Sequence, residues 1–356
     1  MIKYLGSKRL LVPRIVAAMR VLPGVRRIAD PFSGTARVGH ALKRSGYDVH
    51  ASDVLRYAAV LARGYVAADA RRCLPEATRL IGELSRAQPR DGWFTETYCR
   101  SARYFQPANG ARIEGIREAI ARLELEPELE AIALVSLMEA ADRVDSTTGV
   151  QMAYLKQWAP RASNPLELRV PALLPGPGSA REAAAEEIAP TLEVDAAYLD
   201  PPYNQHSYLG NYHVWETLCR WDRPATYGIA CKREDVRERP SAFNRRGEIH
   251  AALERVIGAL ACPWLVVSFS DEGWLTAAEI EALLAPRGHV AVAEIPFKRY
   301  VGAQIGIYNP SGEKVGRVSH LKNRERLFVS GPDREMVRRA VEAATHAGAP
   351  TVLAGS

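Results

Sequence analysis

The fold is decided by the stretch Arg27-Ile28-Ala29-Asp30-Pro31-Phe32-Ser33-Gly34-Thr35-Ala36-Arg37-Val38-Gly39. Its first four residues predict a short strand that ends at Asp30, and the small residues after them predict a turn that opens a helix. A second strand is expected over 47–52 and leads to Asp53, about twenty residues past the turn. At that spacing a carboxylate can accept both hydroxyls of a ribose. The pattern predicts the nucleoside-binding half of a Rossmann-like sheet.

The turn itself lacks the full glycine pattern of a dinucleotide-binding site. Ala36 stands where a second glycine would let the backbone approach a pyrophosphate. We therefore expect a nucleoside without phosphates. A nicotinamide-dependent dehydrogenase, which would use the same early half, predicts a complete glycine turn, and that expectation fails.

A second informative stretch is Asp200-Pro201-Pro202-Tyr203, which follows the apolar run 196–199. A strand should end there and a rigid loop begin, because each proline fixes φ and removes a backbone donor. The loop offers oxygen acceptors beside an aromatic ring, which suits an aromatic amine such as N6 of adenine. Asp and Pro are also ordinary turn residues, so a plain turn is the alternative.

The opening residues Lys3-Tyr4-Leu5-Gly6-Ser7-Lys8 form a turn before a helix whose apolar positions run from Leu10 to Met19. Unpaired N–H groups gather at such a helix start, and with Lys8 they could hold a carboxylate or a phosphate. An ordinary exposed lysine before a helix is an equally good interpretation of this stretch alone.

The 356-residue chain has a formal net charge of +6 and a pI near 9.1, which favours a polyanionic partner. Its basic residues gather in three stretches: Lys3, Lys8, Arg9 and Arg14; Lys232, Arg233, Arg237, Arg239, Arg245 and Arg246; Lys314, Arg317, Lys322, Arg324 and Arg326. We expect some of them to contact phosphate.

Cysteine usage and hydropathy limit the class of protein further. The five cysteines are scattered, so free thiols are expected rather than disulfides or a zinc site. No apolar run reaches the ~18 residues that span a bilayer, and the start of the chain lacks a signal-peptide core. We expect a cytoplasmic protein that binds no membrane.

The alternation of strand and helix stops over 65–165, where two helices are expected at 112–125 and 130–144. The Pro-, Gly- and Ala-rich stretch 160–190 is interpreted as a linker that ends in a short helix. The remaining expected elements are strands at 193–199, 264–270 and 290–295, helices at 212–218, 249–260 and 276–284, a mobile solvent-facing segment at 241–244, and a closing hairpin between 306–309 and 325–329. This order is typical of a doubly wound α/β fold.

Together the motifs around Tyr4, Asp30, Asp53 and Asp200 resemble, in this order, those of the Dam-like, α-permuted DNA adenine-N6 methyltransferases. The run from Tyr203 to His213 is similar to the branch that includes restriction-modification methylases. The resemblance covers most of the chain. It implies an α/β fold with a Rossmann-like class I methyltransferase sheet and a mostly helical target-recognition insertion.

The resemblance also implies a division of the chain into domains. Residues 1–64 and 166–335 would form the catalytic domain that binds S-adenosylmethionine, and residues 65–165 the DNA-binding insertion. Residues 348–356 are expected to be a flexible tail.

Site residues are carried over singly from the family pattern. The residues that it implies for donor binding are Tyr4, Lys8, Asp30, Phe32, Gly34, Asp53 and Asp200, and those that it implies for catalysis are Asp200, Pro201, Pro202 and Tyr203. Asp200 would accept one N6 hydrogen of adenine, a carbonyl of the Pro-Pro segment the other, and Tyr203 would stack on the flipped base. Because Asp30, Asp53 and Asp200 all end predicted strands, we expect them to face one crevice.

The expected function is methyl transfer from S-adenosylmethionine to adenine N6 in double-stranded DNA, for restriction-modification or epigenetic marking. No metal is expected, and the chain should act as a monomer; a cognate restriction enzyme is a further possible partner. The alternatives are a DNA-binding protein of this fold with little activity and a methylase that acts on RNA or another amine. Cytosine-N4 enzymes usually begin the loop with Ser and protein-glutamine enzymes with Asn, so Asp200 favours adenine.

Overall fold

The computed structural model describes residues 1–6, 8–152, 155, 157–298, 307–308, 314–316 and 322–347. Ser7, Arg317 and the expected tail 348–356 lie outside the described residues. The chain divides into two units. The first comprises the described residues of Met1–Arg9, Arg26–Val194 and His206–Ala242, and the second those of Leu10–Val25, Asp195–Gln205 and Phe243–Ser356.

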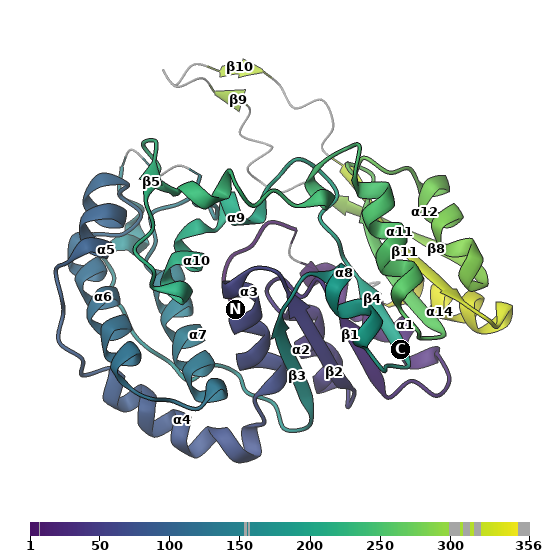
Figure 1. The fold of residues 1–356 in the computed structure, drawn as a ribbon, viewed down its shortest axis with the longest axis horizontal. Coiled ribbons are helices and arrows are strands. Elements are labelled where there is room, and N and C mark those ends of the chain that lie inside the picture. The colour runs from purple at the N-terminus through teal and green to yellow at the C-terminus, as the bar shows by residue number, and fades with distance from the viewer. Residues whose placement is uncertain are drawn as a thin grey trace, which may run out of the picture. The chain divides into compact units, whose positions relative to one another are not determined.

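The first unit contains three parallel strands in the order β3-β2-β1, namely β1 (Arg27–Asp30), β2 (Asp48–Asp53) and β3 (Gly178–Glu182). Helices α2 (Arg37–Arg44) and α3 (Arg56–Ala62) follow β1 and β2 and lie beside them in Figure 1. The register sets Asp53 opposite Glu182. The carboxyl ends of these strands therefore meet at one edge, where α/β sheets bind ligands.

Strand β3 corrects the linker interpretation of 160–190. The strand lies inside that stretch and pairs with β2 from Gly178 to Glu182. Only its central residue, Ala180, is buried, so the alternation that marks a strand in a sequence is missing. Backbone pairing with β2 makes this segment a strand. The short helix α8 (Ala185–Ile188) does end the stretch, as expected.

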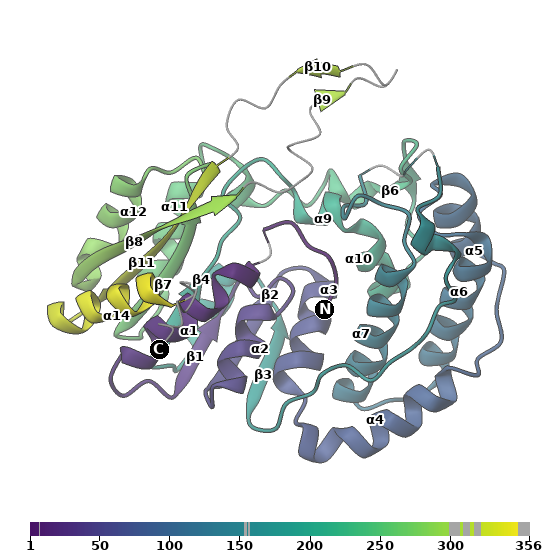
Figure 2. The same ribbon diagram turned by 180° about the vertical axis from the view of Figure 1, so that it is seen from behind.

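The segment 65–165 is helical, as Figure 2 shows. It comprises most of the π-helix Arg63–Ala67, then α4 (Ala70–Leu84), α5 (Trp93–Thr95), the π-helix Glu96–Ser101, α6 (Pro107–Arg122), α7 (Pro127–Arg143) and the 3₁₀ helix Pro160–Ser163. Helices α6 and α7 are the two that the sequence predicts, although each begins earlier, at a proline. Proline suits a first helical position because that N–H has no intrahelical partner.

The second unit contains strands β4 (Ala196–Leu199), β7 (Trp264–Ser270), β11 (Lys322–Gly331) and β8 (His289–Lys298), adjacent in that order. Strand β4 is parallel to β7, whereas β11 runs antiparallel to β7 and β8. Its helices are α1 (Val12–Val21), α11 (Ile249–Ala259), α12 (Ala277–Leu284) and α14 (Arg334–His346). The second unit thus combines a parallel strand pair with antiparallel strands, and the first unit has parallel strands with helices beside them. These features confirm the predicted Rossmann-like α/β class.

The predicted closing hairpin is wrong in its partners. Strand β9 (Ile307–Tyr308) pairs with β10 (Lys314–Gly316), while the segment that contains Glu325–Val329 pairs with β7 and β8. The prediction that 241–244 faces solvent is also wrong. Residues Ala242–Asn244 form a 3₁₀ helix in which Phe243 is 4% exposed. An aromatic side chain in a charged stretch finds a place in the core because burying it is favourable.

Two further 3₁₀ helices are Lys8–Leu10 and, in the second unit, Ala285–Arg287. All the remaining elements lie in the first unit. They are α9 (Tyr208–Asn211), α10 (His213–Arg220), the hairpin strands β5 (Thr226–Tyr227) and β6 (Lys232–Arg233), and two 3₁₀ turns at Ala189–Thr191 and Glu234–Val236. Among the described residues, no helix has both the length and the apolar character needed to cross a membrane.

Candidate active site

Asp53 ends β2, and the backbone of two neighbouring segments holds its carboxylate. Gly34 N–H donates to Oδ2 at 2.9 Å, and Leu55 N–H donates to Oδ1 at 3.0 Å. Burial raises the pKa of Asp53 to about 6, and the nearby Glu216 charge adds to this, against the lowering effect of the backbone hydrogen bonds. Each carboxylate oxygen has a second lone pair. Asp53 can therefore still accept two hydroxyl groups.

The turn after β1 adopts left-handed backbone conformations at two positions. Gly34 has φ +51°, and Ala36 has φ 58° and ψ 17°, although it carries a Cβ. Ser33 N–H donates to the Ser52 carbonyl at 3.0 Å, which fixes the turn against the end of β2. Alanine at Ala36 thus keeps the conformation that glycine would have adopted. Of the other residues in this segment that the sequence singles out, Asp30 is buried and Phe32 is partly exposed.

Four tyrosines from distant parts of the chain surround this turn. The Tyr4 ring stacks on Tyr212 with centroids 4.5 Å apart and on Tyr208 at 5.1 Å, and its hydroxyl lies 3.0 Å from that of Tyr57. A Cβ added at Gly34 would lie 3.6 Å from the Tyr4 ring, so the ring packs over the turn. We call Tyr4, Tyr57, Tyr208 and Tyr212 the tyrosine cluster. Tyr57 and Tyr212 are buried, whereas Tyr4 and Tyr208 are partly exposed, so these two rings present the accessible aromatic surface of the cluster.

Glu216 is fully buried beneath the tyrosine cluster. Its Oε2 accepts the Tyr57 N–H at 3.1 Å, and its Oε1 pairs with Arg220 at 2.7 Å and Arg239 at 3.4 Å. The charge of this carboxylate is therefore compensated by two guanidinium groups and a backbone donor. Such compensation is what allows a buried charge to persist.

Lys8 is 7% exposed, and its Nζ lies 3.4 Å from the Gly6 carbonyl. The interpretation of Lys8 as an ordinary exposed lysine is therefore wrong. The hydrogen bond to a neighbouring carbonyl orients the ammonium group, and this arrangement is compatible with a role toward an anionic or polar ligand. That role stays a prediction.

The acceptor loop 200–203 lies in the second unit, directly after β4. Asp200 Oδ1 accepts the Ser268 hydroxyl at 2.9 Å, and that hydroxyl lies 2.8 Å from the Tyr198 hydroxyl. Ser268 belongs to β7, the parallel neighbour of β4. The orientation of the Asp200 carboxylate is therefore fixed from the adjacent strand.

Further contacts hold the rest of the loop. The Tyr203 ring lies 5.5 Å from that of Phe269 at an angle of 54°, and Trp274 N–H donates to the Tyr203 carbonyl at 3.0 Å. Asn244 Nδ2 donates to the Asn204 carbonyl at 2.7 Å. The rigidity that the two prolines predict is thus reinforced by tertiary contacts. Pro201 is buried and Pro202 partly so.

The structure brings the predicted site residues together in two groups. Tyr4, Gly34 and Asp53 lie side by side in the first unit, and Asp200 and Tyr203 share one loop in the second. The expectation that Asp30, Asp53 and Asp200 face one crevice stays a prediction.

Sequence reasoning missed five residues that support these groups: Tyr57, Tyr208, Tyr212, Glu216 and Ser268. One signal for them was available. Tyr208, Tyr212 and Glu216 are spaced four apart, which places them on one helical face.

Part of the basic stretch 232–246 has a structural role. Arg233 is 3% exposed and pairs with Asp222 at 2.7 Å and Asp235 at 3.0 Å. Arg239 pairs with Glu216 and Asp235. The expectation of phosphate contacts therefore does not apply to Arg233, whose guanidinium is enclosed.

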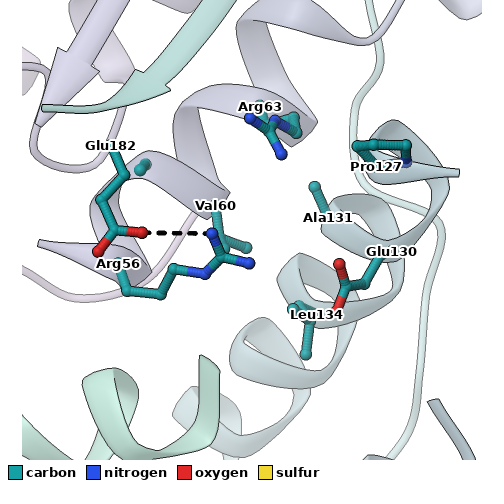
Figure 3. Close-up of a pocket in the computed structure, with 9 residues that line it drawn as sticks. Arg56, Val60, Arg63, Pro127, Glu130, Ala131, Leu134 and Glu182 are labelled. Carbon is teal, nitrogen blue, oxygen red and sulfur yellow. Dashed lines mark hydrogen bonds and ion pairs between the residues drawn. The ribbon is translucent and has the colours of Figure 1, made fainter. Parts of the chain in front are cut away.

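Helices α3 and α7 line a pocket of the first unit, shown in Figure 3. An ion pair between Arg56 and Glu182, 3.2 Å long, lies at its wall, and Glu130 points toward it from α7. It holds no aromatic platform, so the tyrosine cluster is the better candidate for a nucleoside. No group of three metal-ligating side chains is found within the described ranges.

Comparison with known proteins assigns the chain to a family. The family model described as D12 class N6 adenine-specific DNA methyltransferase matches residues 4–255. The type II methyltransferase M.NlaIII of Neisseria lactamica is 26% identical over 314 residues, which cover 83% of this chain and 92% of that protein. The type II methyltransferase M.FokI of Planomicrobium okeanokoites is 29% identical over 323 residues, 84% of this chain and 49% of that protein. The modification methylase StsI of Streptococcus sanguinis is 27% identical over 322 residues, 84% of this chain.

These relatives differ in length. The chain spans nearly all of M.NlaIII but about half the length of M.FokI and StsI. The family match extends from Tyr4 through the acceptor loop at Asp200 and ends at residue 255. Since it covers well over half of the chain, this protein belongs to the D12 class N6 adenine-specific DNA methyltransferase family.

Proposed function

We propose that the protein transfers a methyl group from S-adenosylmethionine to N6 of an adenine flipped out of duplex DNA. The observation that carries this proposal is the orientation of Asp200, whose carboxylate accepts the Ser268 hydroxyl at 2.9 Å in a loop that also presents Tyr203. A carboxylate fixed beside an aromatic ring suits a neutral exocyclic amine. Membership of the adenine-N6 family supports adenine as that amine.

The donor half of the proposal rests on the first unit. Asp53, held by Gly34 and Leu55, has the acceptor capacity for the two ribose hydroxyls of the donor. Tyr4 and Tyr208, the partly exposed rings of the tyrosine cluster, would offer a surface for the rest of the nucleoside and for a cationic sulfonium, since aromatic faces attract cations. Tyr4, Lys8, Asp30, Phe32 and Gly34 complete the proposed donor set.

The residues of the acceptor loop would act on the amine. Asp200 would accept a hydrogen bond from one N6–H, and a carbonyl of the Pro201-Pro202 segment would accept a hydrogen bond from the other. The two bonds would orient the nitrogen lone pair. Tyr203 stacks on the base. S-adenosylmethionine would supply an electrophilic methyl group: the new N–C bond would form as the S–C bond breaks, S-adenosylhomocysteine would leave as the neutral thioether, and the methylated amine would release a proton to water. Positioning and fixed acceptors contribute most of the rate in such a displacement.

We further propose that the helical segment 65–165 contacts the bases of the recognition site, which is the role that the family resemblance implies for this insertion. The relatives are named as type II methyltransferases and modification methylases, which supports a role in restriction-modification with a cognate restriction enzyme. No metal is required by this chemistry.

The test is methyl transfer by the purified chain with S-adenosylmethionine and duplex DNA, followed by mass spectrometry of the nucleosides. We expect N6-methyladenine from the wild type and none from Asp200→Ala. The matched control is Glu335→Ala, because Glu335 is an exposed carboxylate on α14 that pairs with Arg338, outside the proposed DNA-contacting segment. Methylated cytosine, methylated RNA or methylated protein in place of N6-methyladenine would contradict the proposal, and DNA binding without any transfer would favour the inactive DNA-binding alternative.

A further inference from the structure

The most exposed large apolar side chain that the structure describes is that of Ile229, at 78%. It lies in the turn of the β5–β6 hairpin, between Gly228 at φ +67° and Cys231 at φ 45°. Met152, in the loop after α7, is 47% exposed. Single exposed apolar residues are common, so what distinguishes these two is how the chain connects them.

One buried hydroxyl joins the two segments. The Tyr104 hydroxyl lies 2.7 Å from the Gln151 carbonyl and 3.0 Å from the Ala230 carbonyl, so that its single proton is shared between these two acceptors. Gln151 directly precedes Met152, and Ala230 directly follows Ile229. The backbone beside each exposed side chain therefore converges on one atom of the core.

Further hydrogen bonds and ion pairs hold both segments in place. Gln151 is 3% exposed; its side chain accepts the Val214 N–H at 2.9 Å, and its carbonyl lies 2.8 Å from His213 Nε2. In the hairpin, Arg233 is held by Asp222 and Asp235. Both segments are thus held by neighbouring residues before any partner binds, which reduces the backbone entropy lost on insertion.

The two segments connect directly to the tyrosine cluster. Gln151 N–H donates to the Asn211 carbonyl at 2.7 Å. Asn211 precedes Tyr212, whose ring stacks on Tyr4 at 4.5 Å. The exposed apolar pair therefore belongs to the same framework as the proposed donor site. Figures 1 and 2 both show the hairpin beyond the end of α10.

Positive charge accompanies the apolar pair. The Arg237 guanidinium lies 3.7 Å from the centroid of Tyr227, in the hairpin, and Arg103 lies 4.9 Å from that of Trp158. Arg237 is exposed and forms no ion pair with a carboxylate in the described part of the chain. A guanidinium held flat on a ring keeps its N–H groups available for phosphate.

We propose that Ile229 and Met152 form an apolar wedge that enters the DNA duplex and helps to open the target base pair, while Arg237 contacts a phosphate. The inference rests on the proposed function and deepens it. Flipping a base requires unstacking and unpairing, and apolar side chains inserted at a base step offset that cost. The partner is double-stranded DNA, since a single strand has no paired stack to open.

The test begins with sequencing of methylated DNA from cells that express the chain, which gives the recognition site. Short duplexes with that site are then made with thymine or with an abasic position opposite the target adenine. We expect Ile229→Ser, and the double variant with Met152→Ala, to lower kcat/KM on the paired duplex by about tenfold or more. The abasic duplex should restore the rate to within about twofold of the wild type, because no pairing remains to be broken.

Three controls separate this role from a structural one. Ile229→Leu should keep most of the wild-type rate. Ala282→Ser, which changes an exposed apolar residue on α12, outside the proposed DNA-contacting segment, should match the wild type on both duplexes. The Kd for S-adenosylmethionine should be unchanged in Ile229→Ser.

The outcomes are distinguishable. An active wild type with an equally active Ile229→Ser would overturn the wedge and leave the proposed function intact. A variant slowed equally on both duplexes would also overturn it. A wild type that methylates neither duplex would overturn the proposed function and the wedge together.

Discussion

The buried carboxylate of Glu216 accepts the backbone N–H of Tyr57 at 3.1 Å. This bond joins α10 to the first turn of α3, only four residues after Asp53. A negative charge at the start of a helix is favourable, because unpaired N–H groups point outward there. One side chain therefore positions Tyr57 in the tyrosine cluster and also acts on the charge of Asp53.

Glu216→Gln should lower the free energy of unfolding by about 1–3 kcal/mol, as expected when a charged hydrogen-bond partner is lost. The loss stays moderate because each guanidinium retains another ion pair, Arg220 with Glu182 and Arg239 with Asp235. Urea unfolding at pH 7 measures it. Glu248→Gln, which removes an exposed partner of Arg245, should cost less than about 0.5 kcal/mol. Equal effects of the two changes would contradict the role of Glu216.

Donor binding should depend on pH through Asp53, whose pKa is about 6 in the free protein. Ribose hydroxyls prefer the ionised carboxylate, so the Kd for S-adenosylmethionine should rise as the pH falls below 6, by up to about tenfold per unit. Calorimetric titration between pH 5 and 7.5 checks this. Asp53→Asn should bind weakly at every pH. Glu335→Gln is the control, because Glu335 is an exposed carboxylate on α14 that pairs with Arg338 and belongs to neither group of proposed site residues.

The raised pKa of Asp53 also predicts how the free energy of unfolding varies with pH. The folded chain keeps the Asp53 proton up to pH 6, while the unfolded chain loses it near the ordinary value of 3.8. Asp53 should therefore lower the free energy of unfolding as the pH rises from about 4 to about 6. A wild-type profile that is no steeper than that of Asp53→Asn in this range would contradict the shift.

The turn after β1 offers a matched pair of backbone changes. Ala36 has φ 58° and Gly34 has φ +51°. Ala36→Gly should raise the free energy of unfolding by about 0.5–1 kcal/mol, and Gly34→Ala should lower it by about 1 kcal/mol, because a Cβ strains left-handed backbone. Thermal unfolding measures both. Changes of the same sign would contradict the turn geometry.

Ser268→Ala removes the hydroxyl that donates to Asp200. We expect kcat to fall by about tenfold while the Kd for S-adenosylmethionine stays the same, since the carboxylate loses its fixed orientation. Tyr198→Phe removes the next hydroxyl along and should have a smaller effect. Single-turnover methylation assays compare the variants. An unchanged rate in Ser268→Ala would mean that Asp200 is oriented by other contacts.

Phosphate contact by Arg237 predicts a change in salt dependence. Arg237→Ala should weaken DNA binding and reduce the slope of log Kd against log salt by about one. Arg338→Ala is the control, since Arg338 is exposed on α14, outside the proposed DNA-contacting segment, and pairs with Glu335 and Glu342. Fluorescence anisotropy over a range of salt concentrations measures the slopes. An unchanged slope for Arg237→Ala would contradict a phosphate contact by Arg237.

The sequence by itself determined the features that depend on neighbours along the chain. The strand, turn and helix around Gly34 follow from local spacing, as do the strand end at Asp53 and the proline-stiffened loop at Asp200. Helices α6 and α7 follow from apolar residues at helical period. These local patterns were enough for the fold class and for the family resemblance.

Only the tertiary structure decided which distant residues meet. The spacing of Tyr208 and Tyr212 gives no sign that Tyr4 and Tyr57 pack against them, and β3 shows no strand pattern in the sequence, although it pairs with β2. Arg233 cannot be told from its exposed basic neighbours in the sequence, yet in the structure its guanidinium is buried in ion pairs with Asp222 and Asp235. Burial and pairing free energies depend on the groups that surround a side chain, and for these residues those groups come from distant parts of the sequence.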